Sequence, residues 1–304
     1  MSVPAAYIAV VLVWSTTPLG IVWSTEVFHP TFAVFLRMAI ALVIGWIVVK
    51  LWSIKMPWDR AARKLYFFSA IGIVGGMLLS YLAAAYISSG LMSLIFGLSP
   101  ILSGLLAQKI LAEPKFSMAQ KIALALAVTG LGIVSFDNFN LYQNGWIGIV
   151  LVLIAVSLFS LSGVLVKSVQ IQINPIASTL GTLSFATPVF GIVWLLSDGQ
   201  IPTFQIETRG FWAVIYLGVL GSFFAFIAYY YILQKLKAST VALVTLITPA
   251  FALYWGSLLN NEAISHSLIN GAACIIIGLG IYLFGDKIYM MSLAKKPDQN
   301  NQIE

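Results

Sequence analysis

Two stretches decide the fold: GLMSLIFGLSPILSGLLAQKILAE, residues 90–113, and STVALVTLITPAFALYWGSLLNNE, residues 239–262. Each is long and apolar enough to cross a lipid bilayer, which takes about 20 residues of α-helix. Each carries a proline in its middle, Pro100 or Pro249, and each ends in a glutamate thirteen residues after that proline. The second stretch follows the first at an offset of 149 residues, about half the chain, which indicates an internal duplication.

The composition indicates that lipid is the main solvent of the chain. Of its 304 residues, 60% are hydrophobic and only 9% are charged, whereas soluble domains contain about 25% charged residues. The one cysteine, Cys274, excludes an internal disulfide and a cysteine-based metal site. The N-terminus lacks the basic region of a cleavable signal peptide, so we expect the first apolar segment to be a membrane span.

We expect an all-α integral membrane protein with ten transmembrane helices joined mostly by very short connections. The expected helices cover residues 3–23, 30–51, 65–86, 89–112, 118–136, 145–166, 175–197, 210–232, 238–261 and 267–285. They divide the chain into a first five-helix repeat (1–137), a second five-helix repeat (138–286) and a cytoplasmic tail (287–304).

The basic residues predict the orientation in the membrane. Of the 16 Lys and Arg residues, 14 fall on the side that holds both termini and the connections after the even-numbered helices. The exceptions are Arg209, on the opposite side, and Arg37, inside the second helix. Cytoplasmic loops of membrane proteins carry an excess of Lys and Arg. We therefore expect a multi-pass protein of a bacterial-type inner membrane with both termini in the cytoplasm.

The duplication predicts two halves of opposite topology. Because each half has an odd number of spans, the second half must be inverted relative to the first. Further matches at or within one residue of the same offset are Tyr81 with Tyr230, Gly130 with Gly278 and Gly132 with Gly280. Inverted repeats of this kind underlie alternating access in secondary transporters, whose substrate sites are formed by interrupted helices.

Several kinds of chemistry are missing from the sequence. All ten Asp and Glu residues fall at span ends, in loops or in tails, so no carboxylate is expected as a proton or sodium relay at mid-membrane. There is no nucleotide-binding glycine loop, no HExxH helix and no Cys/His cluster. We therefore expect no cofactor, no metal, no catalytic residue and no ATP hydrolysis, and facilitated diffusion or exchange rather than strict proton coupling.

The chain resembles the drug/metabolite transporter superfamily, in its EamA-like branch of ten-helix proteins. The resemblance is carried by Trp14-Ser15-Thr16-Thr17-Pro18 in the first helix, by Pro30 with Arg37 in the second, and by the two Pro-x12-Glu helix ends. It implies a secondary transporter with a cavity between helices 1, 3, 4, 6, 8 and 9. Members with this layout resemble exporters of amino acids, including aromatic ones.

Candidate substrate contacts are aromatic, hydroxyl-bearing or basic residues placed well inside the spans. They are Trp14, Thr17, Arg37, Tyr81, Met92, Phe96, Phe159, Ser160, Tyr229, Tyr230 and Thr245. Aromatic rings inside a bundle can stack on a ring or a cation of a substrate, but they also serve as ordinary packing. Hydroxyl groups can line a cavity or simply hold helices together. Pro100 and Pro249 are candidate hinges, the alternative being static kinks.

Three charged residues have unusual positions. Arg37 lies roughly 10 Å into its span at 1.5 Å per residue, where it could bind a substrate carboxylate, brace helix carbonyls, or extend back to the headgroups. Glu113 and Glu262 end their helices, where a negative charge is mildly unfavourable. They could close gates at opposite faces or cap neighbouring helices, and the alternative is an interfacial helix stop.

The sequence therefore predicts a secondary transporter, an amino acid exporter that works by alternating access around a central cavity. The alternative is an exporter or exchanger of another solute class, such as a drug-like cation, a nucleotide-type solute or a sulfonium metabolite. A membrane scaffold or an intramembrane enzyme fits the pattern less well. The expected partners are a small-molecule substrate and the lipid bilayer, without nucleic acid, and the expected transporter is a monomer.

Overall fold

Helices make up most of the computed structural model, which describes residues 2–141, 144–169, 171–204, 206–236 and 238–294 and contains no β-strand among them. The elements are α1 (Val3–Thr25), α2 (Pro30–Leu51), α3 (Arg60–Ala83), α4 (Ser89–Phe96), α5 (Ser99–Ile110), α6 (Met118–Leu141), α7 (Gly145–Ser168), α8 (Pro175–Ser197), α9 (Arg209–Tyr216), the π-helix η1 (Leu217–Phe224), α10 (Ala225–Lys235), α11 (Ala238–Asn260) and α12 (His266–Ala294).

Local sequence signals explain where several helices begin. Pro30 and Pro175 stand at the first positions of α2 and α8, where the missing N–H costs nothing. The Asp59 carboxylate accepts hydrogen bonds from the backbone N–H groups of Ala61 and Ala62. This cap starts α3 at Arg60, five residues earlier than predicted, because it satisfies N–H groups that have no partner within the helix.

The described part of the chain contains eight helical segments long and apolar enough to cross a membrane, with α4 and α5 taken as one segment and α9 to α10 as another. The two other predicted spans, 118–136 and 238–261, correspond to α6 and α11, which are helical. Side chains at residues 135–143 and 237–243 lie outside the described part, and the count of ten spans stays a prediction.

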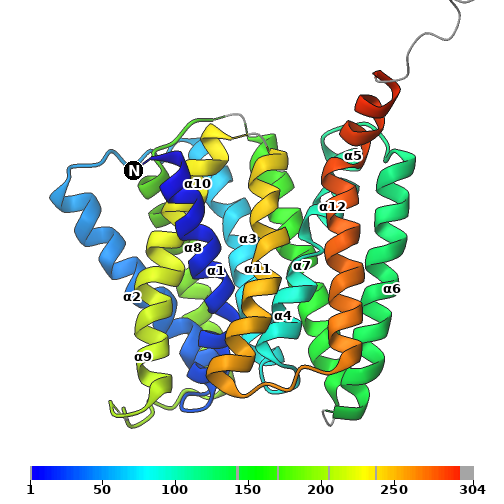
Figure 1. Cartoon of the computed structure of the whole chain (residues 1–304). Coiled ribbons are helices and arrows are strands. Elements are labelled where there is room, and N and C mark those ends of the chain that lie inside the picture. Colours follow the sequence, from blue (N-terminus) through cyan, green and yellow to red (C-terminus); the bar gives the residue numbers. More distant parts are fainter. Residues whose placement is uncertain (1, 142–143, 170, 205, 237, 295–304) are drawn as a thin grey trace, which may run out of the picture.

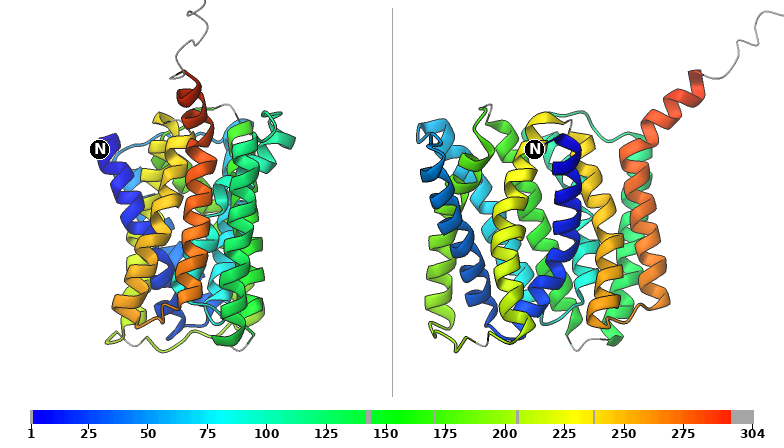
Figure 2. Two further views of the ribbon diagram at one scale, coloured as in Figure 1. Left: turned by 45° about the vertical axis from the view of Figure 1, so that its right-hand side comes forward. Right: turned by 60° about the vertical axis from the view of Figure 1, so that its left-hand side comes forward.

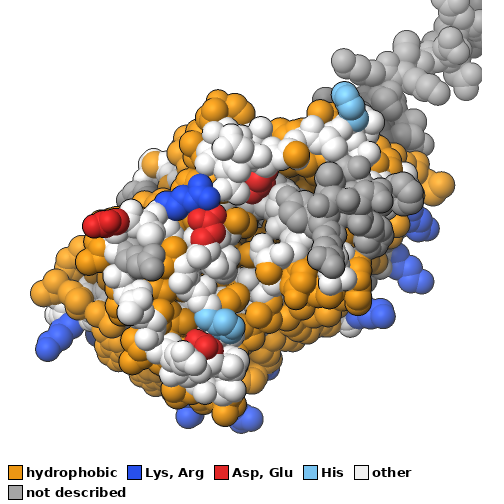
Figure 3. All heavy atoms as spheres, turned by 90° about the horizontal axis from the view of Figure 1, so that it is seen from below, with side chains coloured by type: hydrophobic (Ala, Val, Ile, Leu, Met, Phe, Trp, Pro, Cys, Tyr) orange, Lys and Arg blue, Asp and Glu red, His pale blue; other side chains and the backbone are white. Residues whose placement is uncertain are grey.

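The helices stand side by side with their axes along one common direction (Figures 1 and 2). The start of α1 and the end of α12 lie at the same end, the upper end in Figure 1. Lys50, Lys109, Lys167 and Lys235 occupy the last turns of α2, α5, α7 and α10, which also reach this end. Figure 3 views the lower end, where acidic side chains lie within the face and basic ones stand mainly at its rim.

The outer faces of the bundle are apolar. Large side chains such as Val43, Leu195 and Ile277 are more than half exposed, as orange surface around the sides of Figure 3 shows. Monomeric soluble proteins rarely expose contiguous apolar surface of this extent. Lipid therefore covers these faces.

Helices from the first half of the chain pack mainly against helices from the second. α3 packs against α7, α2 against α8, α6 against α12, and α4 against α11, while α1 contacts both α10 and α11. The α6–α12 contact is very close: a Cβ added at Gly130 would lie 2.6 Å from the carbonyl oxygen of Gly271. A Cβ at Gly132 or Gly280 would meet nothing within 4 Å.

The predicted span 89–112, in which Pro100 is a candidate hinge, is divided into two helices. α4 ends at Phe96 and α5 begins at Ser99, because the N–H groups of Gly97 and Leu98 bond back to carbonyls three residues earlier and tighten the turn. Pro100, which has no N–H, occupies the first turn of α5. Pro249, its counterpart in the sequence, lies inside the continuous helix α11. The two proline stretches therefore have different conformations.

The predicted helix 210–232 contains a feature that the sequence did not indicate. Residues Leu217–Phe224 form a π-helix, η1, between α9 and α10. π-helical turns are rare and often occur at functional sites. Gly218 fits against the carbonyl oxygen of Arg37, to which an added Cβ would come within 3.1 Å. The wider turn thus brings η1 into direct contact with α2 at the buried arginine.

Candidate functional site

Three adjoining cavities lie inside the bundle, lined by residues of α1 to α7 and of α10 to α12. The upper cavity has a volume of about 360 Å³, the deep cavity about 90 Å³ and the side cavity about 30 Å³. Trp14 and Phe159 line all three. Ser99 and Thr245 are shared by the upper and deep cavities. The cavities therefore form one connected region that is divided by a few side chains.

The upper cavity reaches the upper end of the bundle. Its walls include Glu113, which is exposed after the end of α5, and Lys167, in the last turn of α7. Pro100 and Ser103 line its inner part. This cavity gives solvent a path from the upper end to Trp14.

The deep cavity lies beyond Trp14 and is mostly apolar. Its walls are Trp14, Thr17, Pro18, Ile21, Arg37, Met77, Ser80, Met92, Ser93, Phe96, Ser99, Phe159, Phe226, Thr245 and Thr248. Five of the predicted contact residues besides Trp14 and Phe159 therefore lie in this wall: Thr17, Arg37, Met92, Phe96 and Thr245. No acidic side chain lines it among the residues that the structure describes.

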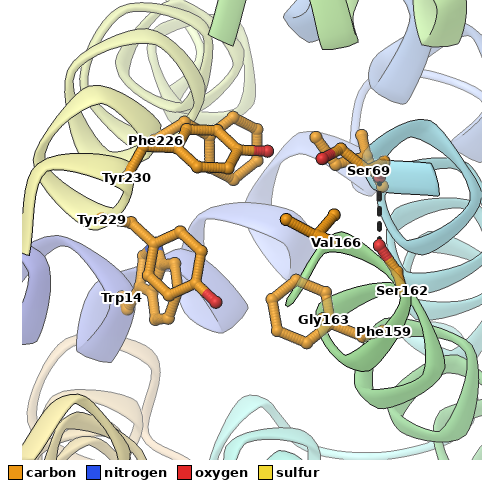
Figure 4. Close-up of a pocket in the computed structure, with 10 residues that line it drawn as sticks. Trp14, Ser69, Phe159, Ser162, Gly163, Val166, Phe226, Tyr229 and Tyr230 are labelled. Carbon is orange, nitrogen blue, oxygen red and sulfur yellow. Dashed lines mark hydrogen bonds between the residues drawn. The ribbon is translucent and has the colours of Figure 1, made fainter. Parts of the chain in front are cut away.

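Aromatic rings divide the cavities. The Trp14 ring lies 5.1 Å from the Tyr229 ring and 6.3 Å from the Phe159 ring, measured between centroids. Phe159 also meets Phe96 edge to face at 6.3 Å. Figure 4 shows Trp14 and Tyr229 side by side on one wall of the side cavity, with Phe159 on the facing wall and Tyr230 beside Phe226. Four helices thus contribute to one aromatic cluster.

Two predicted contact residues line none of these three cavities. Tyr81 is fully buried among core side chains, and it lines none of the three cavities. Ser160 is also buried, and its hydroxyl oxygen lies 3.2 Å from that of Ser99. Because this pair joins α5 to α7, the structure gives Ser160 a packing contact between helices.

Arg37 is fully buried and turns toward η1. Its Nε donates a hydrogen bond of 2.7 Å to the hydroxyl of Ser222. Nη1 and Nη2 have no hydrogen-bond partner among the described residues. The alternative of a side chain that extends to the headgroups is therefore wrong, because Ser222 holds the guanidinium inside the bundle.

Glu262 joins two helices at the lower end. Its carboxylate accepts hydrogen bonds from the backbone N–H groups of Ser89, at 3.1 Å, and Gly90, at 3.2 Å, in the first turn of α4. These N–H groups have no partner within the helix, and the helix dipole favours a negative charge there. We call this contact the Glu262 latch. Asn260 donates to the same carboxylate and accepts a bond from the Trp23 indole, which adds α1 to the contact.

Glu113 has the same backbone conformation as Glu262, but its carboxylate makes no hydrogen bond to another helix among the described residues. Each glutamate follows a residue with a positive φ angle, 53° at Ala112 and 51° at Asn261. The backbone N–H of each glutamate also donates a hydrogen bond to the carbonyl oxygen six residues earlier. The N–O distance is 3.3 Å from Glu113 to Ala107 and 3.1 Å from Glu262 to Gly256. This is the Schellman pattern of helix ends. The duplicated sequence therefore builds the same helix end twice, once packed against α4 and once exposed.

Sequence reasoning missed the partners of these groups. Ser222 and Asn260 carry no motif, and their importance depends on which helix lies opposite. It also missed the ion pair between Glu26 and Arg209, whose Nε lies 2.8 Å from the carboxylate and ties α1 to α9 at the lower end. Of these contacts, only the one between η1 and α2 had a signal in the sequence, namely the small residues around Gly218 and Gly221.

Comparisons with known proteins identify the family. The model of the EamA-like transporter family matches residues 3–136 and 146–284. An uncharacterized transporter of Archaeoglobus fulgidus is 23% identical over 88% of this chain and 94% of its own length. Protein PagO of Salmonella typhimurium is 25% identical, covering 93% and 92%, and the uncharacterized inner membrane transporter YedA of Escherichia coli is 24% identical, with the same coverage.

A solved crystal structure shares the fold, with a TM-score of 0.63 and 17% identity over 92% of this chain and 96% of the other. The family match and the relatives confirm the resemblance seen in the sequence. The chain belongs to the EamA-like transporter family, within the drug/metabolite transporter superfamily, and is a multi-pass membrane transporter rather than an enzyme.

Proposed function

We propose that this protein is a secondary transporter that exports an amino acid by alternating access. The observation that carries the proposal is the asymmetry of the central region. The upper cavity leads from the upper end to Trp14, while Glu262, Asn260 and the Glu26–Arg209 pair join helices at the lower end. A site that is accessible from one side and closed on the other is what one state of an alternating-access cycle requires.

The division into two inverted five-helix repeats supports this mechanism. The family model matches two segments of similar length, and the main helix contacts join one half to the other. The two proline stretches end in the same backbone geometry but differ at the prolines, since one is split into α4 and α5 and the other is continuous in α11. Exchange of these conformations between the halves would close the upper end and open the lower one.

The basic residues set the proposed orientation. The lysines at the ends of α2, α5, α7 and α10 mark the upper end as cytoplasmic by the positive-inside rule. The structure then represents an inward-facing state, from which a cytoplasmic solute enters. An inner membrane location agrees with the name of the relative YedA, an uncharacterized inner membrane transporter.

The cavity walls favour an amino acid over the alternative solute classes. Aromatic rings and hydroxyls suit a small, partly apolar solute. A drug-like or sulfonium cation would lack a counter-charge in the deep cavity, whose one charged side chain among the described residues is Arg37. An amino acid with a large apolar side chain matches both the aromatic walls and the positive charge of Arg37, since its side chain can stack on the rings and its carboxylate is negative.

Counterflow in proteoliposomes tests the proposal. Vesicles that hold the purified protein and an excess of unlabelled L-phenylalanine should take up labelled L-phenylalanine faster than empty vesicles, without ATP and with an ionophore present. Exchange of a nucleotide or a sulfonium compound, with none of any amino acid, would favour the alternative substrate classes. An absence of flux for every solute would contradict transport by this chain.

Trp14→Ala should weaken substrate recognition strongly. Trp14 lines all three cavities and packs on Tyr229, so its removal merges the cavities and deletes a stacking surface. Aromatic pairs contribute about 1 kcal/mol beyond burial, and with the lost contact area we expect a roughly tenfold higher half-saturation concentration for the transported aromatic amino acid. Trp146→Ala, on the exposed face of α7, serves as the control and should leave this concentration unchanged. Equal effects of the two substitutions would contradict a cavity role for Trp14.

A further inference from the structure

We propose that the Arg37 guanidinium is the carboxylate-binding group of the deep cavity, and that the substrate is a solute with a carboxylate and an apolar body. The inference rests on the proposed function, because it requires that a solute enters this cavity. It adds a specific residue and a chemical requirement to that function.

The charge balance around Arg37 is the first argument. The side chain is fully buried, and a guanidinium stays protonated in proteins. A charge inside a membrane protein is costly unless it is paired or faces water. Among the described residues, no acidic side chain is buried and none lines the deep cavity. The protein itself therefore offers this cation no counter-charge.

The unused donors are the second argument. Nε is fixed by its 2.7 Å bond to Ser222, but Nη1 and Nη2 have no acceptor among the described residues. Two parallel N–H groups of a guanidinium match the two oxygens of a carboxylate. Gly221 keeps the adjacent space free, since a Cβ there would come within 3.2 Å of Nη2. Ser222 thus positions a donor pair that a carboxylate can use.

The cavity walls determine what else the ligand must have. Besides Arg37, the deep cavity presents Met92, Phe96 and Phe226, with hydroxyls from Thr17 and Thr248. At about 90 Å³ it has room for a small group only, and the ligand body would extend into the adjoining upper cavity of about 360 Å³. Small-molecule sites commonly measure about 300–1,000 Å³. The two cavities together fall in this range.

Access to the guanidinium requires a local movement. Nη1 and Nη2 are both buried in this state, so a carboxylate reaches them only after a neighbouring wall residue shifts. Met92 lies in that wall, and its unbranched side chain adapts readily. Binding of the carboxylate would therefore be coupled to rearrangement at α4, the helix whose start is held by the Glu262 latch.

Matched acid and amide ligands test the inference by binding alone. The probes are 3-phenylpropionate against 3-phenylpropionamide, and L-phenylalanine against L-phenylalaninamide, in thermal-shift titrations of the full-length protein in detergent. We expect each acid to stabilise the wild type at a concentration at least tenfold lower than its amide. Arg37→Gln should abolish this difference, and Arg37→Lys should keep part of it because the charge remains.

Two further variants make the result specific. Ser222→Ala keeps the charge of Arg37 but removes the hydrogen bond that orients it, so we expect stabilisation by the acids to need a several-fold higher concentration. This variant also tests the inference if Arg37→Gln does not fold. Arg63→Gln removes an exposed arginine of α3 that lies outside the site and should not change the acid–amide difference. Equal effects of acid and amide on the wild type, including no effect of either, would overturn the inference, as would an unchanged difference in Arg37→Gln.

The counterflow assay separates this inference from the proposed function. Solute exchange by a protein that does not distinguish acid from amide would leave transport standing and refute the role of Arg37. An Arg37-dependent preference for acids without any flux would establish the anion site and refute transport.

Discussion

Glu262→Ala is expected to make the deep cavity accessible from the lower end. The substitution removes a carboxylate that accepts two backbone hydrogen bonds from the start of α4 and one from Asn260. Hydrogen bonds to a charged group contribute about 1.5–3 kcal/mol. A loss of about 2 kcal/mol from the closed state corresponds to a roughly thirtyfold shift toward the open one. The effect should be large because no other acidic side chain of the described residues caps the first N–H groups of α4.

Cysteine labelling measures this shift. In a Cys274→Ala background, which removes the native thiol, Ser93→Cys places a reporter in the wall of the deep cavity. A membrane-impermeant maleimide added outside intact cells should label this position about thirtyfold faster when Glu262 is alanine. Glu207→Ala changes an exposed acidic residue in the loop before α9 and should leave the rate unchanged. A labelling rate that does not respond to Glu262→Ala would show that the latch does not hold the lower end closed.

Gly130→Ala is expected to destabilise the protein, whereas Gly132→Ala is not. A Cβ at Gly130 would lie 2.6 Å from the Gly271 carbonyl oxygen and 2.9 Å from the Cβ of Cys274. Backbone atoms cannot move aside without separating α6 from α12. Overpacking of this kind costs about 1–3 kcal/mol, which for a chain of this size lowers the unfolding midpoint by about 5 °C.

The control lies two residues along the same helix. A Cβ at Gly132 meets nothing within 4 Å, and alanine forms helices better than glycine, so Gly132→Ala should leave the midpoint unchanged or raise it slightly. Thermal unfolding of both variants in the same detergent gives the comparison. Similar midpoints for the two would mean that the α6–α12 contact is looser than the structure shows.

The sequence located most of the helices because a membrane span leaves a strong pattern. About 20 consecutive apolar residues, a proline at N1 of α2 and of α8, and lysines at helix ends locate most elements within a few residues. The side chains on the outward faces of the helices need only be apolar, so the composition alone predicts that these faces contact lipid. Helix starts were less accurate where a side chain such as Asp59 extends the helix beyond its apolar part.

The interior of the bundle was only partly predictable. Trp14, Phe159 and Tyr229 could be selected because aromatic residues at mid-span are distinctive, but Tyr81 has the same signature and lies in the core. The difference depends on helix rotation, which periodicity cannot give when a helix is apolar on every side. Whether a helix is interrupted at its proline also depends on how that helix packs against its neighbours. The helix around Pro100 is divided into α4 and α5, whereas α11 continues through Pro249.

The role of Glu262 illustrates the same limit. Its position at a helix end, repeated at Glu113, indicated that it could cap a neighbouring helix. Which helix it meets depends on how α11 and α4 pack, although the bonded residues are 172 and 173 positions apart in the sequence. That packing also requires Gly256, since a Cβ there would lie 2.5 Å from the Glu262 carboxylate.

The π-helix η1 has a consequence for the tolerance of this chain to insertions and deletions. Successive residues of an α-helix turn by about 100° around its axis. The π-helical turn takes up one residue more than an α-helical turn, so removal of one residue between Leu217 and Phe224 would let the segment regularise while the later side chains of α10 largely keep their direction. A residue inserted into the regular helix after Phe224 would instead turn every later side chain of α10 by about 100°. Tyr229 and Phe226 would then leave the cavity wall although neither had been altered. Such an insertion is therefore expected to abolish recognition, a deletion within η1 to affect it less, and length changes in the loop between α8 and α9 to be tolerated.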